Sequence, residues 1–237
     1  MELYTDGLDP IKTIMAESSL LDKPWRKFHE FNAEYRKYNV KDHNSGQTLK
    51  IRLCDTRGLE EEFTIDSQEI SHILDGNFNP SAPFTTETFG FIRKPRLGDR
   101  IHCVAFVVDG STIDVIPEKI LKQMKAMQSQ MNQRNIPQVI YLTKLDKVCP
   151  MVEEDAGHMF HSSEVHEAVD KIAEIMGLPR GFVLPIKNYE SETILDHNID
   201  ILTLKALKQT ADFSDDYIEE QVDKMAAEIG HRIKGIL

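Results

Sequence analysis

The stretch that decides the fold is Leu-Lys-Ile-Arg-Leu-Cys-Asp-Thr-Arg-Gly-Leu at residues 49–59. Ile51 and Leu53 alternate with polar residues, which is the pattern of a half-buried β-strand, and the run closes on Asp-Thr-Arg-Gly. A strand that ends in this way places a carboxylate at the carboxyl edge of a sheet. There Asp55 could hold Mg²⁺ through a water, and Gly58 would let the backbone approach a phosphate. An ordinary strand end followed by a turn is the alternative interpretation.

Composition narrows the class of protein. The 237 residues are 41% hydrophobic and 28% charged, which suits one α/β domain, and the net charge of −11 argues against a nucleic-acid surface. Three scattered cysteines (Cys54, Cys103 and Cys149) are too few for a disulfide framework, and Cys54 and Cys103, which lie in apolar runs, predict buried thiols in a reducing compartment. No apolar run is long enough to span a bilayer and no secretory signal is recognisable, so we expect a cytoplasmic protein.

The order of the remaining segments predicts a mostly parallel sheet covered by helices on both faces. Two β-prone runs, residues 35–40 and 48–54, flank a polar turn and predict an antiparallel hairpin at one edge. Further along, apolar runs and helical periodicities alternate. The expected strands are residues 101–108, 137–142 and 182–186, and the expected helices are residues 65–74, 116–135, 165–176, 199–213 and 217–233.

The two ends of the chain are the least regular. Residues 1–34 show little pattern, apart from Ile11, Ile14 and Met15, which could mark one short helical turn. The sequence therefore predicts three parts: an irregular segment at 1–34, an α/β domain at 35–213 and a C-terminal helix at 214–237.

A second signature, Thr-Lys-Leu-Asp at residues 143–146, follows a predicted buried strand. The carboxylate of Asp146 can accept hydrogen bonds from the N1 and the exocyclic amine of guanine, while the stem of Lys144 lies along the base or ribose. Adenine would leave polar groups unpaired in such a site, so the geometry discriminates between the two bases. A plain turn at a strand end is the equally simple alternative.

With both signatures in place, the chain resembles the interferon-induced protein 44 and 44-like family. The resemblance runs over roughly residues 35–220 and is carried by residues 53–59, 99–109 and 142–146, with Lys187 beginning the last nucleotide-proximal turn. It implies a P-loop GTPase-like domain, GTP and Mg²⁺ as ligands, and an interferon-induced, cytoplasmic role in innate antiviral immunity. The nucleotide-binding positions that it implies are Asp55, Gly58, Thr143, Lys144, Asp146 and Lys187, with Asp55 also the metal ligand.

Part of the expected nucleotide site is missing from the sequence. A P-loop needs Gly-x-x-x-x-Gly-Lys-Ser/Thr to wrap the phosphates, and none of the 237 residues form that pattern. The switch threonine expected before the hairpin is absent, and Leu59 stands where many hydrolysing relatives place glutamine. We therefore assign no catalytic residue and expect weak or no nucleotide binding, despite the GTPase activity that the resemblance implies.

An internal deletion would explain the missing motif. Residues 24–27 resemble the lead-in to the first strand of the family, and Tyr35 resembles the start of the second. A deletion between about Phe28 and Tyr35 predicts a sheet without its first strand, with open edges and marginal stability. A P-loop exon in the genomic locus between these codons supports this hypothesis, whereas contiguous coding DNA rejects it.

Two function classes stay open from the sequence. The first is a guanine-nucleotide-binding protein of innate immunity, and the second is a non-catalytic interaction protein built on a degenerate GTPase-like domain with unidentified protein partners. The histidines at 158, 161 and 166 lack metal-ligand spacing and predict a solvated loop and helix start rather than a metal site.

Overall fold

A computed structural model of the chain describes residues 12–18, 36–42, 45–56, 58–59, 67–77, 91–190 and 192–234. In this part of the chain, six strands form one sheet in the order β2-β3-β1-β4-β5-β6. All neighbouring strands are parallel except β2, which pairs antiparallel with β3 and makes the predicted edge hairpin. The strands are β1 (Lys12–Ser18), β2 (Arg36–Lys41), β3 (Thr48–Asp55), β4 (Cys103–Asp109), β5 (Gln138–Thr143) and β6 (Val183–Pro185).

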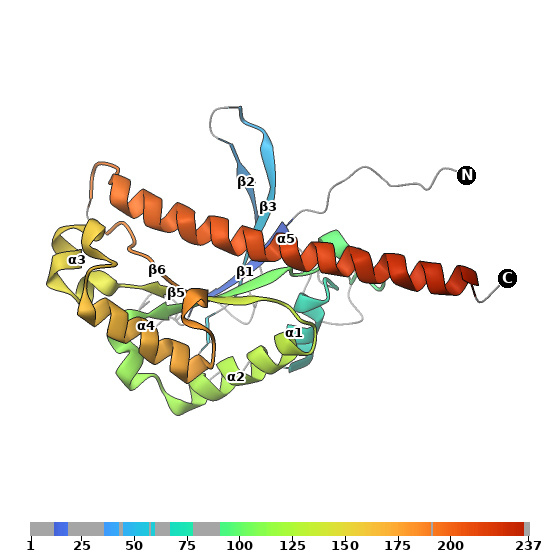
Figure 1. Ribbon diagram of the computed structural model, residues 1–237, viewed down its shortest axis with the longest axis horizontal. Coiled ribbons are helices and arrows are strands. Elements are labelled where there is room, and N and C mark those ends of the chain that lie inside the picture. The colour runs from blue at the N-terminus through green and yellow to red at the C-terminus, as the bar shows by residue number, and fades with distance from the viewer. Residues whose placement is uncertain are drawn as a thin grey trace, which may run out of the picture.

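Helices cover both faces of the sheet, as the alternation of segments predicts. The long α5 lies along one face, while α1, α2 and α4 lie on the other (Figure 1). The α-helices are α1 (Ser67–Leu74), α2 (Glu118–Asn132), α3 (Pro150–Glu154), α4 (Ser163–Met176) and α5 (His197–Lys234). Short 3₁₀ turns are η1 (Leu97–Asp99), η2 (Gly110–Val115), η3 (Leu145–Lys147), η4 (Ala156–His158) and η5 (Arg180–Phe182).

The central strand β4 is buried on both faces, which explains its nearly continuous apolar sequence. Val104 and Phe106 belong to the larger core, together with residues of α1, α2 and α4. Cys103 and Ala105 point the other way and pack with Ala206 of α5. The α/β class, the parallel sheet and the edge hairpin are therefore confirmed.

The prediction that the first strand is missing is wrong. Residues 12–18 form β1, which lies between β3 and β4 and pairs in parallel with both. The helical turn expected at Ile11, Ile14 and Met15 is wrong for Ile14 and Met15, which lie in β1, and Ile11 lies outside the described residues. Residues 12–18 therefore depart from the irregular structure that we expected within 1–34. The physical reason is that β3 and β4 would otherwise expose unpaired backbone groups, and an extended segment satisfies them whatever its side chains. The proposed deletion after Phe28 and the marginal stability stay predictions.

The C-terminal helix is also longer than predicted. We expected separate helices at 199–213 and 217–233, but α5 runs unbroken from His197 to Lys234. No glycine or proline interrupts the junction, and the hydroxyl of Ser214 donates to the carbonyl oxygen of Thr210 at 2.9 Å, inside the helix. The division of the chain into three parts stays a prediction, although its boundary at 213/214 falls within this helix. Among the described residues, no helix has the length and apolar character to cross a membrane.

Candidate functional site at the strand ends

The carboxyl ends of β4, β5 and β6 meet at one edge of the sheet. Asp109, the last residue of β4, lies opposite Thr143, the last residue of β5. The backbone N–H of Ile186 donates to the carbonyl oxygen of Leu142 at 2.9 Å, which carries the chain after β6 alongside the end of β5. The fold therefore places the predicted turn at Thr143 and the predicted Lys187 at adjacent strand ends.

Lys144 sits in a left-handed conformation, with φ of 55°, at the start of the η3 turn. Its ammonium Nζ lies 2.8 Å from Oδ2 of Asp109. The other carboxylate oxygen of Asp109 accepts from the backbone N–H and the hydroxyl of Ser111, at 2.9 and 2.6 Å. Burial raises the pKa of Asp109, but the hydrogen bonds from Lys144 and Ser111 outweigh burial and hold the pKa below its ordinary value.

Sequence reasoning did not assign Asp109 to the site. The available signal was its place directly after a buried strand, beside the strand that leads into Lys144. Gly110 follows it, and a Cβ there would lie 2.9 Å from both the carbonyl oxygen of Thr143 and a side-chain carbon of Leu145. The two strand ends therefore pack so closely that only glycine fits between them.

Thr143 is held by the protein itself. Its side chain is buried, and its hydroxyl donates to the carbonyl oxygen of Val108 at 3.1 Å. This hydrogen bond ties the end of β5 to the end of β4. The hydroxyl therefore supports the turn, and Thr143 as a nucleotide-binding residue stays a prediction.

Asp146 differs from its neighbours. It is only 8% exposed, yet no hydrogen bond or ion pair joins its carboxylate to another described residue. The buried side-chain atoms that lack a partner do not include its oxygens, so the carboxylate reaches solvent and is free to accept from the donors of a ligand. Guanine carries two adjacent donors of this kind.

Lys187 is buried and bound by acidic and backbone groups. Its Nζ lies 3.1 Å from Oε1 of Glu192 and 3.4 Å from the carbonyl oxygen of Glu153. Close by in sequence, Glu190 pairs with Lys147 of the η3 turn at 3.6 Å. The segment after β6 is thus fastened to the turn that carries Asp146.

Asp55 lies apart from this group, although it belongs to the same sheet, and Gly58 as a nucleotide-binding residue stays a prediction. The strand register gives the offset along the sheet. Asp55 of β3 pairs with Ala16 of β1, which pairs with Ala105 of β4, which in turn pairs with Val139 of β5. Asp55 is therefore level with a residue four positions before Thr143. Two strands, β1 and β4, separate β3 from β5, so the lateral spacing is about 14 Å. The described residues hold no cluster of His, Cys, Asp and Glu suited to a metal ion. Asp55 as a metal ligand stays a prediction.

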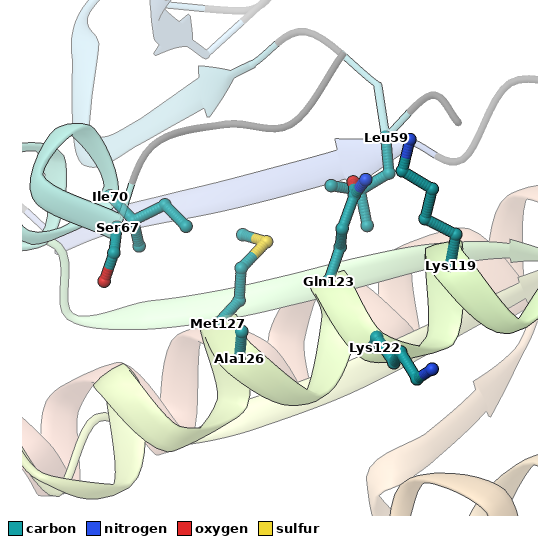
Figure 2. Close-up of a pocket in the computed structure, with 8 residues that line it drawn as sticks. All are labelled: Leu59, Ser67, Ile70, Lys119, Lys122, Gln123, Ala126 and Met127. Carbon is teal, nitrogen blue, oxygen red and sulfur yellow. The ribbon is translucent and has the colours of Figure 1, made fainter. Parts of the chain in front are cut away.

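Two cavities lie elsewhere. One of about 240 Å³ lies between α1 and α2, and Figure 2 shows Ile70 and Met127 extending into it from the two helices. The other, of about 310 Å³, lies beneath α5 and is almost entirely apolar, with Asp55 in its wall. Asp146 lines neither of these two cavities.

Comparison with known proteins places the chain among relatives. No family model matches it. It is 36% identical to human interferon-induced protein 44-like over 194 residues, which are 78% of this chain and 43% of that protein. It is 30% identical to human interferon-induced protein 44 over 207 residues, 83% of this chain and 47% of that protein, and 28% identical to the mouse protein over 193 residues, 79% of this chain and 46% of that protein.

Solved structures give weaker matches. A crystal structure of a probable GTP-binding protein engB matches with a TM-score of 0.43 at 14% identity, over 88% of this chain and 99% of that chain. The bacterial dynamin GTPase LeoA from ETEC matches with a TM-score of 0.48 at 10% identity, over 94% of this chain and 39% of that chain. The description of the fold therefore depends on the strand order rather than on these scores. In sequence the chain is similar to interferon-induced protein 44 and 44-like, and it spans less than half the length of those proteins.

Proposed function

We propose that this chain is a GTPase-like protein of the interferon-induced, antiviral innate response. We further propose that it acts in the cytoplasm and keeps a site for the guanine base while binding whole nucleotides weakly or not at all. The names of its relatives support the first part. The second part rests on one observation: Asp146 is largely enclosed, yet its carboxylate has no partner among the described residues and reaches solvent.

The turn at 143–146 supplies the chemistry for base recognition. The carboxylate of Asp146 accepts from the two neighbouring donors of guanine, a pair that adenine does not present. The ion pair between Lys144 and Asp109 fixes the stem of Lys144 beside the turn. Because Thr143 is tied to Val108 and Gly110 closes the gap between strands, the turn is preorganised.

Phosphate binding is the weak half of the proposed site. The sequence has no P-loop, and phosphates together with Mg²⁺ supply much of the affinity for a nucleotide. Asp55 is exposed and lies several strands away from Asp146. We therefore expect guanosine and GTP with Mg²⁺ to bind with similar, low affinity and no hydrolysis to follow.

Calorimetric titration with guanosine, adenosine and GTP–Mg²⁺ tests this proposal. Asp146→Asn should weaken guanosine binding at least tenfold, because the amide nitrogen faces the guanine donors. Asp212→Asn is the matched control, since Asp212 is an exposed aspartate that pairs with Lys208 on α5. If GTP–Mg²⁺ bound with micromolar affinity and far more tightly than guanosine, the proposal that the phosphates are bound weakly would be wrong. If guanosine and adenosine bound with equal affinity, the proposal that Asp146 recognises guanine would be wrong.

A non-catalytic interaction protein is the second candidate. The observation that favours it is that the ammonium groups of Lys144 and Lys187 are both already paired with carboxylates of the chain, Asp109 and Glu192. Lysines satisfied in this way have less to gain from an anionic ligand. No response to guanosine at millimolar concentration, with the fold intact by circular dichroism, selects this candidate.

A further inference from the structure

The cavity beneath α5 shares no lining residue with the turn at residues 143–146. It has a volume of about 310 Å³ and lies between α5 and the base of the β2–β3 hairpin. Figure 1 shows why space remains there, since among the described α-helices only α5 lies on this face of the sheet. One helix is about 10 Å wide, whereas six strands about 4.8 Å apart span roughly 24 Å, so α5 covers only part of the face.

The inner wall of the cavity, as far as the described residues form it, is apolar. The side chains of Cys54, Ile186 and Ala206 line it and are buried, and Leu53 and Leu207 extend the wall. An engineered apolar cavity of about 150 Å³ stays dry and binds benzene. The cavity beneath α5 has about twice that volume and therefore suits an apolar molecule larger than benzene.

Two hydroxyl groups in the wall are already satisfied by the protein. The hydroxyl oxygen of Tyr141 lies 2.8 Å from that of Thr210, and the hydroxyl of Thr203 donates to the carbonyl oxygen of Ile199 at 3.0 Å. A ligand would have to break these hydrogen bonds in order to use either group, which costs free energy. The part of a ligand that enters the cavity must therefore be apolar.

The mouth of the cavity carries the one charged group among its described lining residues, the carboxylate of Asp55. Asp55 and Tyr38 are both exposed, and they lie on the same face of the hairpin, because Tyr38 pairs with Leu53 and Asp55 follows Leu53 by two residues. Diagonal neighbours of this kind are about 7–8 Å apart across two strands. No hydrogen bond or ion pair joins the side chain of Asp55 to another described residue.

A carboxylate beside an exposed aromatic ring favours a positively charged group. The carboxylate attracts a cation and repels an anion, and the face of a tyrosine ring attracts an ammonium group. We propose that the cavity binds a small apolar amine. Its hydrocarbon part lies against Leu53, Ile186 and Ala206, and its protonated amine lies at the mouth, between Asp55 and Tyr38.

Amide chemical-shift titration of the full chain with three six-carbon probes tests this proposal. At neutral pH n-hexylamine is positive, n-hexanol is neutral and hexanoate is negative, so the probes differ mainly in the charge of the head group. We expect n-hexylamine to shift the signals of residues 53–55 and 203–207 and to bind about fivefold more tightly than n-hexanol, as an exposed ion pair allows. Hexanoate should bind most weakly. Equal affinities for n-hexylamine and n-hexanol, or no binding of either at millimolar concentration, would overturn the proposal.

Two variants separate the contribution of the charge from that of the cavity. Asp55→Asn should lower the affinity for n-hexylamine to that for n-hexanol, a change of about fivefold, whereas Asp212→Asn removes an exposed aspartate of α5 outside the cavity and should leave both affinities unchanged. Thr203→Phe should weaken both probes by about tenfold, because the ring takes the place of part of the hexyl chain. Leu204→Phe is its matched control, since Leu204 is exposed and does not line the cavity. Equal losses in the two aspartate variants, or parent-like binding in Thr203→Phe, would contradict the assignment of the amine to this cavity.

Discussion

The carboxyl ends of β5 and β3 each carry an aspartate signature, but the structure supports them differently. At the end of β5, the turn at 143–146 is packed against β4 by Gly110, tied to it by Thr143 and braced by the Lys144–Asp109 ion pair. At the end of β3, Asp55 is exposed. The difference teaches that a short signature acquires chemical meaning from the groups packed around it, because these decide whether its carboxylate is preorganised.

The largest effect should come from closing the gap between β4 and β5. In Gly110→Ala, the new Cβ meets the backbone of Thr143 and the side chain of Leu145, so we expect the free energy of unfolding to fall by about 2 kcal/mol. Urea denaturation measures this change. Gly181→Ala, where a Cβ meets nothing within 4 Å, should stay close to the parent chain. Equal losses in both variants would show that β4 and β5 do not pack this closely.

A smaller effect should follow removal of the ion pair between Lys144 and Asp109. Asp109→Ala deletes the partner of Lys144 and the cap that accepts from Ser111, and we expect a loss of about 1 kcal/mol at pH 7. Because the folded-state pKa of Asp109 lies below its unfolded value, its contribution is complete above the unfolded pKa and disappears as pH falls through the folded pKa.

Denaturant melts of Asp109→Ala and the parent chain at pH 7 and under acidic conditions check this pH dependence. The difference between the two chains should be largest at pH 7 and shrink below about pH 4, the ordinary range of an aspartate. A difference that does not change with pH would mean that the charge of Asp109 does not stabilise the turn.

The smallest effect should come from the end of β3. Asp55→Asn removes an exposed carboxylate, so we expect a stability change within about 0.5 kcal/mol and no change in guanosine binding. Thermal unfolding and calorimetric titration measure the two quantities. Loss of guanosine binding in this variant would place Asp55 in the same site as Asp146 and remove the contrast between the two ends.

The sequence predicted the parts of the fold that depend on periodicity. The alternating and continuous apolar runs located β3, β4, β5 and the edge hairpin, because strand pairing and burial leave their pattern in those residues. It did not predict β1 at Lys12–Ser18. This segment joins the sheet by pairing its backbone with β3 and β4, and its sequence lacks the apolar periodicity by which we located the other strands. Nor did we predict that α5 is continuous, although no glycine or proline separates its two segments and nothing in the sequence required a break between them.

The candidate site was predicted unevenly for a related reason. Thr143, Lys144 and Asp146 lie in one turn, so their proximity follows from their order in the chain. The pairing of Lys144 with Asp109, and of Lys187 with Glu192, depends on which strands are neighbours and on loop conformation. The distance of Asp55 from this group depends on strand register, which the motifs do not encode.

Amide chemical-shift mapping with guanosine, and with adenosine as the control, tests the central claim most directly. The account predicts that guanosine shifts the signals of residues 109–111, 143–147 and 187–190 and leaves those of residues 51–59 in place, while adenosine shifts neither group. Guanosine shifts confined to residues 51–59, or identical shifts with both nucleosides, would contradict a base-recognising turn at Asp146.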